Sequence, residues 1–286
     1  MYKSIETKNL ELKEIFNLMI SGIAPRPIAF VSSQDSNGHD NLAPFSYFNG
    51  FGSNPPIIGF SPANSGRTGK QKDTLLNIKE TKEFCVSIVD DDMVEQVSLS
   101  SCEYDRSIDE FVKSGFSKKQ SSLITPPGVL DSPFIMECKL YDIIELGNNP
   151  GSGNLILGEI LCFHVRENIL NDNNEIDPYK LNPIARLGYN FYTRSKDGLF
   201  EVFKPRCNGI GFDQLPPLIR ESEILNGNQL AKLAGVEAIP TKSNDFSKFD
   251  QLSSKQLYDI IHSALSTNNI SEAWQAIIRI IEKDVQ

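Results

Sequence analysis

The chain has 286 residues, 40% of them hydrophobic and 23% charged, which is enough apolar material for one or two folded domains. Its 28 Lys and Arg against 37 Asp and Glu give a net charge of −9, which excludes general nucleic-acid binding because phosphate contacts require a basic face. No apolar run approaches the ~20 residues of a membrane helix, and the N-terminus has no signal-peptide pattern, so we expect no membrane partner.

Cysteines and histidines are few and scattered. The 5 cysteines include no C-x-x-C pair, which predicts free thiols in a reducing cytoplasm rather than disulfides or a zinc site. His39, His164 and His262 are isolated from one another in the sequence. The sequence therefore predicts neither a metal cluster nor a catalytic triad, and we expect His164 to be structural.

The predicted elements begin with a helix over residues 10–21, where apolar residues recur at helical spacing. Short strands follow, and Asn37-Gly38 between the first two predicts a tight hairpin turn. A second helix is expected over residues 73–82, with Asp73 or Thr74 as its N-cap. The predicted strands of this region cover residues 27–33, 41–51, 56–61 and 83–89.

Two long β-rich runs dominate the middle of the chain. Residues 134–146 and 154–167 are separated by a glycine-rich stretch at residues 147–153, so we expect a long hairpin. Short helices are expected at residues 91–101 and 107–114. Many short strands with few helices between them favour an antiparallel barrel over a doubly wound parallel sheet.

The last part of the chain reads as helical. Apolar residues at i, i+3, i+4 and i+7 over residues 257–264 and 274–281 predict two amphipathic helices, the second with Ser271 as its N-cap. We expect the apolar face that carries Trp274 and Ile277 to pack on the barrel or on a partner subunit.

These shifts in character place a domain boundary after residue 205. We expect residues 1–205 to form the functional domain, which is mainly β with peripheral helices. Residues 206–286 are expected to form a helical C-terminal extension.

Residues 61–74 carry the strongest signal for a ligand. The segment leaves a predicted strand, holds glycines and basic residues, and ends at a predicted helix N-terminus, where free N–H groups and the helix dipole stabilise a phosphate. It is not a P-loop, because Gly66 and Gly69 are too close together. The alternative is a solvated, flexible surface loop. The candidate binding residues are Ser61, Arg67, Thr68, Lys72, Asp73 and Thr74.

A second signal lies in the strand segment at residues 41–50. Pro44 removes a ladder donor and indicates an edge or a bulge, where backbone groups face a ligand instead of another strand. Ala43 and Pro44 are small or flat enough for an aromatic ring to rest on them, and Ser46 shares a face with Pro44 if the strand is regular. The alternative is an ordinary half-buried strand.

Five motifs follow one another along residues 15–205. They are A-P-R-P-I-A-F-V-S from Ala24, N-L-A-P-F-S-Y-F from Asn41, K-D-T-L-L-N-I from Lys72, G-E-I from Gly158 with His164, and R-L-G from Arg186 with Tyr192. In this order they resemble the flavin reductase-like family of FMN-binding split-barrel proteins. The resemblance implies a six-stranded antiparallel split β-barrel that forms a homodimer, with FMN near the subunit interface.

The resemblance also implies a set of cofactor contacts. The backbone around Ala43, Pro44 and Phe45 is expected to meet the isoalloxazine ring. Contacts to the phosphate and the ribityl chain are expected from Ser46, Arg67, Lys72 and Thr74. The expected FMN-binding set is completed by Ser61, Thr68, Asp73 and Arg186.

Proteins of this kind reduce flavins with NAD(P)H, carry electrons as flavoredoxins do, or serve as oxygenase components. We expect an FMN-dependent oxidoreductase that uses NAD(P)H, with no catalytic side chain because the cofactors carry the hydride chemistry. One alternative is an FMN-holding electron carrier or oxygenase partner with little NAD(P)H activity. The other is a non-catalytic split-barrel binding module.

Overall fold

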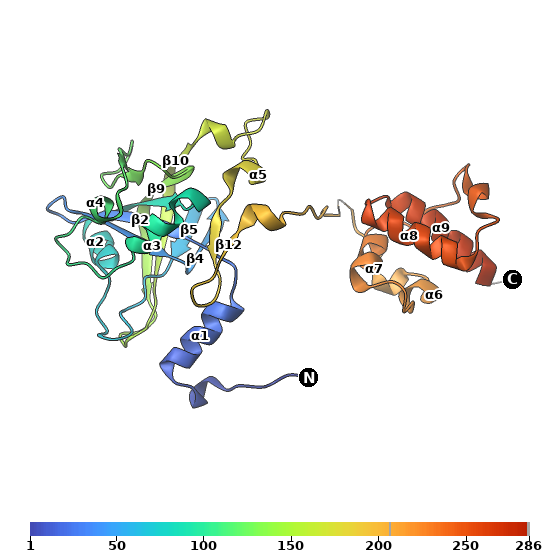
Figure 1. Cartoon of the computed structure of the whole chain (residues 1–286), viewed down its shortest axis with the longest axis horizontal. Helices are drawn as coiled ribbons and strands as arrows, with labels where there is room; N and C mark the ends of the chain where they lie inside the picture. The colour runs from blue at the N-terminus through green and yellow to red at the C-terminus, as the bar shows by residue number, and fades with distance from the viewer. Residues whose placement is uncertain (206, 285–286) are drawn as a thin grey trace. The chain divides into compact units, whose positions relative to one another are not determined.

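The computed structural model describes residues 1–205 and 207–284, and the chain divides into two compact units (Figure 1). The first unit is Met1–Phe200 and the second is Glu201–Gln286. The sequence placed this boundary after residue 205, and the roles of the two parts as a functional domain and a C-terminal extension stay predictions. None of the described helices combines the length and the apolar composition that a membrane crossing requires.

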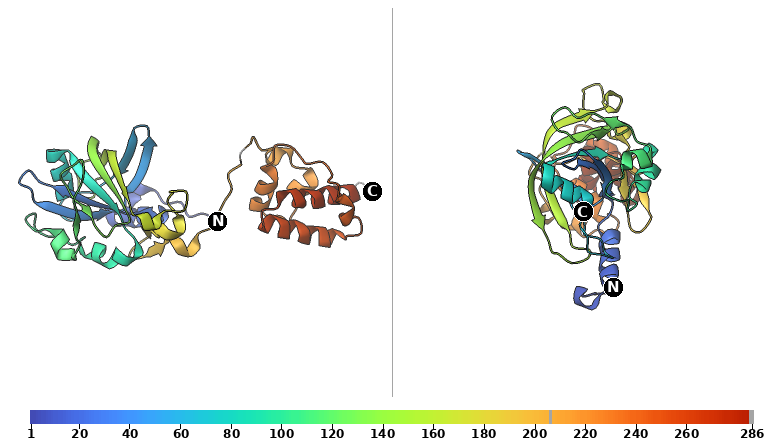
Figure 2. Two further views of the ribbon diagram at one scale, coloured as in Figure 1. Left: turned by 90° about the horizontal axis from the view of Figure 1, so that it is seen from above. Right: turned by 90° about the vertical axis from the view of Figure 1, so that its left-hand side faces the viewer.

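A sheet of seven antiparallel strands forms the frame of the first unit, in the spatial order β3-β2-β6-β9-β10-β5-β4. The strands are β2 (Ala29–Gln34), β3 (Asp40–Phe45), β4 (Phe48–Ser53), β5 (Pro56–Phe60), β6 (Glu83–Ile88), β9 (Phe134–Glu145) and β10 (Asn154–Val165). The sheet curls on itself (Figure 2), and among the described residues no pairing joins its edge strands β3 and β4. This architecture is a split barrel, as the sequence predicted.

The number of strands differs from the six expected. The sequence predicted one return strand over residues 41–51, but the chain bends at Ser46 and Tyr47 and divides this segment into β3 and β4. The two parts then pair with different partners, β3 with β2 and β4 with β5. One predicted strand therefore supplies both edges of the sheet.

Small elements surround the barrel. Two further sheets join β1 (Arg26–Pro27), β11 (Ile184–Arg186) and β12 (Tyr192–Arg194), and β7 (Lys118–Lys119) with β8 (Gly128–Val129). The helices are α1 (Leu12–Gly22), which projects from the barrel in Figure 1, α2 (Asp73–Thr81), α3 (Val94–Leu99), α4 (Glu110–Ser114) and α5 (Pro178–Leu181). Short 3-10 turns lie at Thr7–Asn9, Asp91–Met93, Glu167–Ile169 and Ser195–Gly198.

Aromatic side chains fill the barrel interior. Phe60 and Phe84 are fully buried with ring centroids 5.5 Å apart, and Phe45 packs on Phe60 at 5.3 Å. A Cβ at Gly158 of β10 would lie 2.3 Å from the Phe84 ring, so only glycine leaves room for that ring. Because the interior is closely packed, a ligand has to bind outside it.

The helix α2 begins beside this core, and its start differs from the prediction. Its N-cap is Lys72, whose side chain makes no capping bond, so Asp73 and Thr74 lie inside the first turn. Leu75 and Ile78 are fully buried in the same apolar cluster as β2, which fixes the helix against the sheet. The polar start of α2 is thereby held next to β3.

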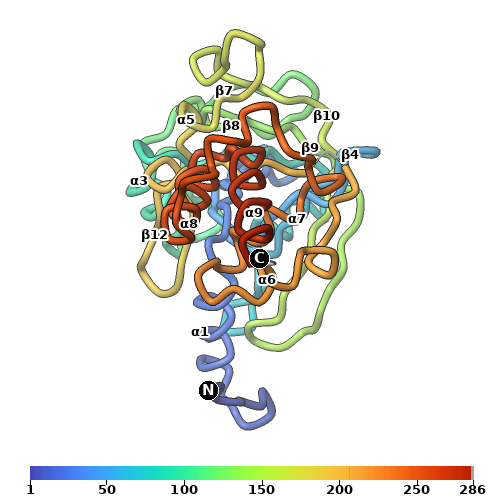
Figure 3. The backbone as a smooth tube through the Cα atoms, turned by 90° about the vertical axis from the view of Figure 1, so that its right-hand side faces the viewer, coloured from blue at the N-terminus to red at the C-terminus, as the bar shows by residue number. Residues whose placement is uncertain are grey.

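The second unit is helical. Its elements are α6 (Pro217–Arg220), α7 (Gly227–Ala234), α8 (Ser254–Ser266) and α9 (Ile270–Asp284), with 3-10 turns at Phe212–Gln214 and Phe246–Phe249. The two predicted amphipathic helices, α8 and α9, lie side by side (Figure 3). The N-cap prediction was wrong by two positions: Ser271 lies within α9, and the Asn269 side chain accepts the N–H of Glu272 at 3.3 Å.

The apolar face of α9 packs within its own unit. Trp274 and Ile277 are fully buried in a cluster that α6, α7 and α8 complete, and the Trp274 indole N–H donates to the Leu233 carbonyl at 3.2 Å. The expectation that these two residues pack on the barrel or on a partner was therefore wrong. Amphipathicity showed that the face is covered, but not which element covers it.

Candidate functional site

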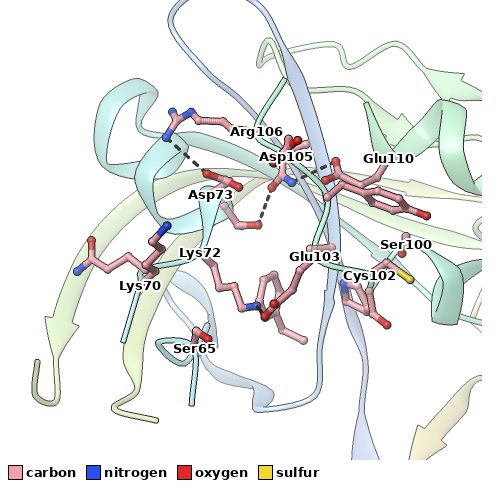
Figure 4. Close-up of a pocket in the computed structure, with 18 of the residues that line it drawn as sticks. Ser65, Lys70, Lys72, Asp73, Ser100, Cys102, Glu103, Asp105, Arg106 and Glu110 are labelled. Atoms are coloured by element: carbon pink, nitrogen blue, oxygen red, sulfur yellow. Dashed lines mark hydrogen bonds and ion pairs between the residues drawn. The ribbon is translucent and has the colours of Figure 1, made fainter. Parts of the chain in front are cut away.

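A polar pocket of about 430 Å³ lies on the outside of the barrel, where β3, the first turn of α2 and residues 100–106 meet (Figure 4). Three segments that are far apart in the sequence form its walls. Its lining residues are Asn41, Ala43, Pro44, Phe45, Ser65, Thr68, Lys70, Gln71, Lys72, Asp73, Thr74, Ser100, Ser101, Cys102, Glu103, Tyr104, Asp105, Arg106 and Glu110.

One wall is the connection between β5 and α2. Backbone hydrogen bonds of 2.8 Å close this connection on itself, from Ser65 to the Lys70 carbonyl and from Gly69 to the Ser65 carbonyl. The Asn154 side chain of β10 donates to the Pro62 carbonyl at 2.9 Å and so anchors the segment to the long hairpin. The loop that carries the predicted phosphate ligands is therefore fixed at both ends.

Two cations of this loop converge on one carboxylate. Arg67 Nη2 lies 2.5 Å from Glu103 Oε2, and Lys72 Nζ lies 3.3 Å from Glu103 Oε1 (Figure 4 shows Lys72 and Glu103 pointing toward one another). Hydrogen bonds from Arg67 and Lys72 lower the pKa of Glu103. Arg67 and Lys72 thus hold an anionic group between them. Because all three side chains reach solvent, another anion can replace the Glu103 carboxylate there.

A chain of polar contacts joins α2 to β3 and α4. Thr74 Oγ1 donates to Asn41 Oδ1 at 2.7 Å, and Asn41 Nδ2 donates to Glu110 Oε2 at 3.2 Å. The same carboxylate oxygen accepts the backbone N–H of Leu42 at 3.0 Å. Burial raises the pKa of Glu110, against the opposing effect of the hydrogen bonds from Leu42 and Asn41. This network sets the spacing between the helix start and the edge strand.

The strand β3 gives the pocket its apolar wall. The Leu42 N–H points to Glu110 and away from β2, and because hydrogen-bonding directions alternate along a strand, Pro44 also faces the free edge. Because proline lacks a backbone N–H, Pro44 leaves no unpaired donor at this edge. The half-buried Ala43, Pro44 and Phe45 line the pocket and offer a surface on which a flat ring can rest.

The structure brings seven of the predicted binding residues to this pocket. They are Ala43, Pro44, Phe45, Thr68, Lys72, Asp73 and Thr74. Arg67 reaches the pocket wall through its contact with Glu103. The roles of all these residues stay predictions.

The other three predicted residues do not line the pocket. Ser46 Oγ accepts from Arg26 Nε at 3.4 Å, at the bend between β3 and β4. The Ser61 N–H donates to the Tyr47 carbonyl at 2.9 Å. Arg186 stacks on the Tyr192 ring, 4.8 Å from its centroid, next to Arg26 across the β1–β11 pair. Ser46 and Ser61 lie at the β3–β4 bend, and Arg186 lies beside Arg26. Their roles as ligands also stay predictions.

Sequence reasoning missed the wall at residues 100–106 and the carboxylate of Glu110. Arg106 bridges Asp73 at 3.6 Å and donates to Asn77 Oδ1 at 2.9 Å, which holds this wall against α2 (Figure 4). Most of the segment falls between the helices expected at residues 91–101 and 107–114, and its main signal was the density of charged and hydroxyl residues. Such density is typical of any solvated turn and does not indicate a site.

Comparison with known families gives one match. The sequence profile of the family described as "Flavin reductase like domain" matches residues 21–190, which is more than half of the chain. The matched segment lies within the first unit and contains both β3 and α2.

Solved structures agree with this match. The chain is similar to nitrilotriacetate monooxygenase component B from Bacillus cereus, with 32% identity, a TM-score of 0.65, and coverage of 71% of this chain and 98% of that one. It is also similar to 2-nitrobenzoate 2-nitroreductase NbaA from Pseudomonas fluorescens, with 30% identity, a TM-score of 0.64 and the same coverage of 71% and 98%. A split-barrel domain protein from Shewanella frigidimarina shares the fold at 24% identity and a TM-score of 0.59, over 69% of this chain and 94% of that one.

Proposed function

Because the chain belongs to the flavin reductase like domain family, we propose that the pocket beside β3 binds FMN and that the protein is an oxidoreductase supplied with electrons by NAD(P)H. Family membership by itself establishes a flavin-related oxidoreductase or a flavin-binding partner of one. The choice of FMN, of a nicotinamide donor and of this pocket is our proposal. The observation that carries it is the convergence of Arg67 and Lys72 on a single anionic group beside an apolar strand edge.

The residues present fit a flavin mononucleotide. The Glu103 carboxylate lies where a phosphate would be held by the same two cations, and Ser65 and Thr68 also line the pocket with their hydroxyl groups available as donors. The N-terminus of α2, which has nine residues, adds the positive end of a helix dipole. Ala43 and Pro44 of β3 line the same pocket and offer the flat surface that an isoalloxazine ring requires.

When bound, FMN supplies the hydride and electron-transfer chemistry. The side chains of this pocket bind and orient. Lys72 and Arg67 neutralise the phosphate, and charge-assisted hydrogen bonds of this kind contribute about 1.5–3 kcal/mol each. Asn41 and Glu110 hold β3 at a fixed distance from α2, so the edge on which the ring rests does not move with the loop.

The test is a titration of the full-length protein with FMN and with riboflavin, followed by anaerobic addition of NADH or NADPH. We expect FMN to bind more tightly than riboflavin, because only FMN engages the cations. Bleaching of the bound flavin at turnover rates would support a reductase. Equal affinities for the two flavins would overturn the assignment of the phosphate site.

A second candidate is an FMN-holding partner of an oxygenase or an electron carrier. The similarity to a monooxygenase component B favours it. The same anaerobic experiment separates the two, because a carrier would remain yellow in the presence of NADH and NADPH. A protein that is colourless and cannot be reconstituted with FMN would instead be a non-catalytic module.

We also infer that the first unit pairs with a second copy of itself. Leu161, Phe163 and Val165 share one face of β10 and are 41%, 51% and 36% exposed, which is an apolar stripe that a partner would cover. Sedimentation equilibrium of the full chain should give a dimer, and Phe163→Lys should weaken it. A monomer with full flavin occupancy would contradict this inference.

A further inference from the structure

A cluster of three metal-ligating side chains lies on β9 and β10, on residues that do not line the pocket. It consists of Glu137 on β9 and of Cys162 and His164 on β10, and the ligand atoms of the three residues all lie within 4.8 Å of one another. Sequence spacing did not predict this grouping, because Glu137 is distant from the other two in the chain. We propose that Glu137, Cys162 and His164 form a binding site for one Zn²⁺ ion.

The geometry of β10 brings the thiol to the carboxylate. The register of the β9–β10 pair shifts between Ile160 and Cys162, so Cys162, and not Leu161, stands opposite Glu137. A bulge of this kind turns side chains to the other face of a strand and is frequent near functional sites. His164 follows two residues later on the same face as Cys162, while Leu161 and Phe163 point to the opposite, apolar face.

Backbone hydrogen bonds fix the orientation of the Glu137 carboxylate. Glu137 is fully buried, and its two oxygens accept the backbone N–H groups of Ser122 at 2.6 Å and Leu123 at 2.7 Å. Carboxylates that ligate metals are in general held by such outer hydrogen bonds, which set their orientation. Oxygen Oε1 also contacts His164 Nε2 at 2.5 Å, so a lone pair of the carboxylate already faces the imidazole.

The distances suit zinc with a small adjustment. Cys162 Sγ lies 3.8 Å from His164 Nε2, close to the sulfur–nitrogen edge of about 3.6 Å that tetrahedral zinc bond lengths give. The Nε2–Oε1 contact has to open to about 3.3 Å, so the ion replaces the hydrogen bond between these atoms. Zinc binding releases the Cys162 thiol proton to solvent. The imidazole ligates through Nε2 as its Nδ1–H tautomer, so the proton that Nε2 shares with Glu137 passes to solvent or to Nδ1.

The donor set excludes the hard divalent cations. Sulfur, imidazole nitrogen and one carboxylate are ligands of Zn²⁺, whereas Ca²⁺ and Mg²⁺ require oxygen donors alone. The His164 side chain is 21% exposed and Cys162 is partly exposed, so the ion can enter from solvent, and a water can complete the fourth position. A simple buried ion pair between Glu137 and His164 would not need a thiol at this place.

The test uses the full-length, reduced protein after removal of metal, without added flavin. Zn²⁺ is titrated in competition with a chromophoric zinc chelator, and we expect one equivalent to bind. Cys162→Ser and His164→Gln should each weaken zinc binding at least about tenfold. We chose both changes to preserve the fold, because Ser is nearly isosteric with Cys and Gln retains an N–H that can bond Glu137. Far-UV circular dichroism of each variant checks that the fold is unchanged. Cys102→Ser, at an exposed thiol outside the cluster, is the matched control and should bind zinc like the unchanged protein.

A second readout keeps the proposal falsifiable if a variant does not fold. Co²⁺ bound to the unchanged protein should show thiolate-to-metal charge-transfer absorption, and prior alkylation of the accessible thiols Cys102, Cys162 and Cys207 should abolish it. Absence of zinc binding in the unchanged protein would overturn the proposal. Binding that survives both Cys162→Ser and His164→Gln would overturn it as well. Neither outcome depends on whether the protein binds FMN.

Discussion

The two units differ in how they use polar side chains. The second unit encloses one continuous apolar cluster around Trp274, and the apolar faces of its helices pack against one another. The first unit divides its apolar residues among several clusters, and it buries polar groups such as Glu110, Asn77 and Glu137 between them. A buried polar group costs free energy unless it is hydrogen-bonded, so such groups mark places where the fold serves more than stability.

This contrast indicates where ligand chemistry resides. In the first unit the buried carboxylate of Glu110 lines the pocket, and the buried carboxylate of Glu137 belongs to the proposed zinc site with Cys162 and His164. Among the described residues of the second unit, no comparable grouping of metal-ligating side chains is found. The comparison therefore predicts that changes in the two units have separable effects.

The largest effect is expected from a cavity in the helical unit. Leu257 is fully buried, so Leu257→Ala should cost about 2–5 kcal/mol of the free energy of unfolding of that unit. The chain has 1 tryptophan, Trp274, so its fluorescence during denaturant unfolding reports this unit alone. FMN affinity should not change, and the exposed Leu218→Ala should have little effect on either property. A parallel loss of FMN affinity in Leu257→Ala would break the comparison.

The next effect concerns the cations of the pocket. Lys72→Gln should weaken FMN binding by about 1.5–3 kcal/mol and leave riboflavin binding unchanged, because only the phosphate loses a charged partner. Calorimetric titration with both flavins measures this. Lys139→Gln is the matched control, since Lys139 is an exposed lysine of β9 outside the pocket lining. If Lys72→Gln weakened the binding of FMN and of riboflavin equally, the phosphate would not lie at Lys72.

These predictions also show how far the sequence leads. Alternation of apolar residues and the Asn37-Gly38 turn located the strands, because local patterns encode them. The division of residues 41–51 at Ser46 was not visible, because both halves carry strand-like residues and only the pairing partners differ. Lys72 and Thr74 could be proposed as ligands because a helix start has a local signature, and the structure places both in the pocket lining.

The opposite wall of the pocket could not be predicted in this way. Glu103 and Glu110 reach β3 and α2 only through tertiary packing, and nothing local distinguishes them from other surface acids. The same holds for Glu137, whose role depends on a bulge in the neighbouring strand. Patterns within one element predict that element, whereas contacts between distant segments require the fold.

A smaller effect is expected at Glu103. Its carboxylate competes with an incoming phosphate for Arg67 and Lys72, so Glu103→Gln should raise FMN affinity severalfold. Stability should change little, because exposed ion pairs contribute weakly. Titrations at low and high salt measure the gain, with Glu167→Gln as the control at an exposed carboxylate outside the pocket lining. A loss of affinity would show that Glu103 supports the ligand instead of competing with it.

The smallest effect is a pH dependence from Glu110. Burial raises its pKa in the folded state, so its contribution to stability is fully present below the unfolded pKa of about 4.3 and is lost as pH rises through the folded pKa. Glu110→Gln cannot ionise and still accepts the Leu42 N–H, so it should gain stability relative to the unchanged protein as pH rises. Denaturation at several pH values tests this, with the exposed Glu95→Gln as control. A stability difference independent of pH would contradict it.

The free edge of β3 has a consequence for self-association. An exposed edge strand is a template on which another chain can add a strand, which leads to aggregation. Along β3 the Leu42 N–H is already bonded to Glu110, and Pro44 has no N–H to offer. An incoming strand therefore meets two consecutive outward positions without an available donor. The residues that leave this edge open to a small molecule also prevent a second polypeptide from extending the sheet there.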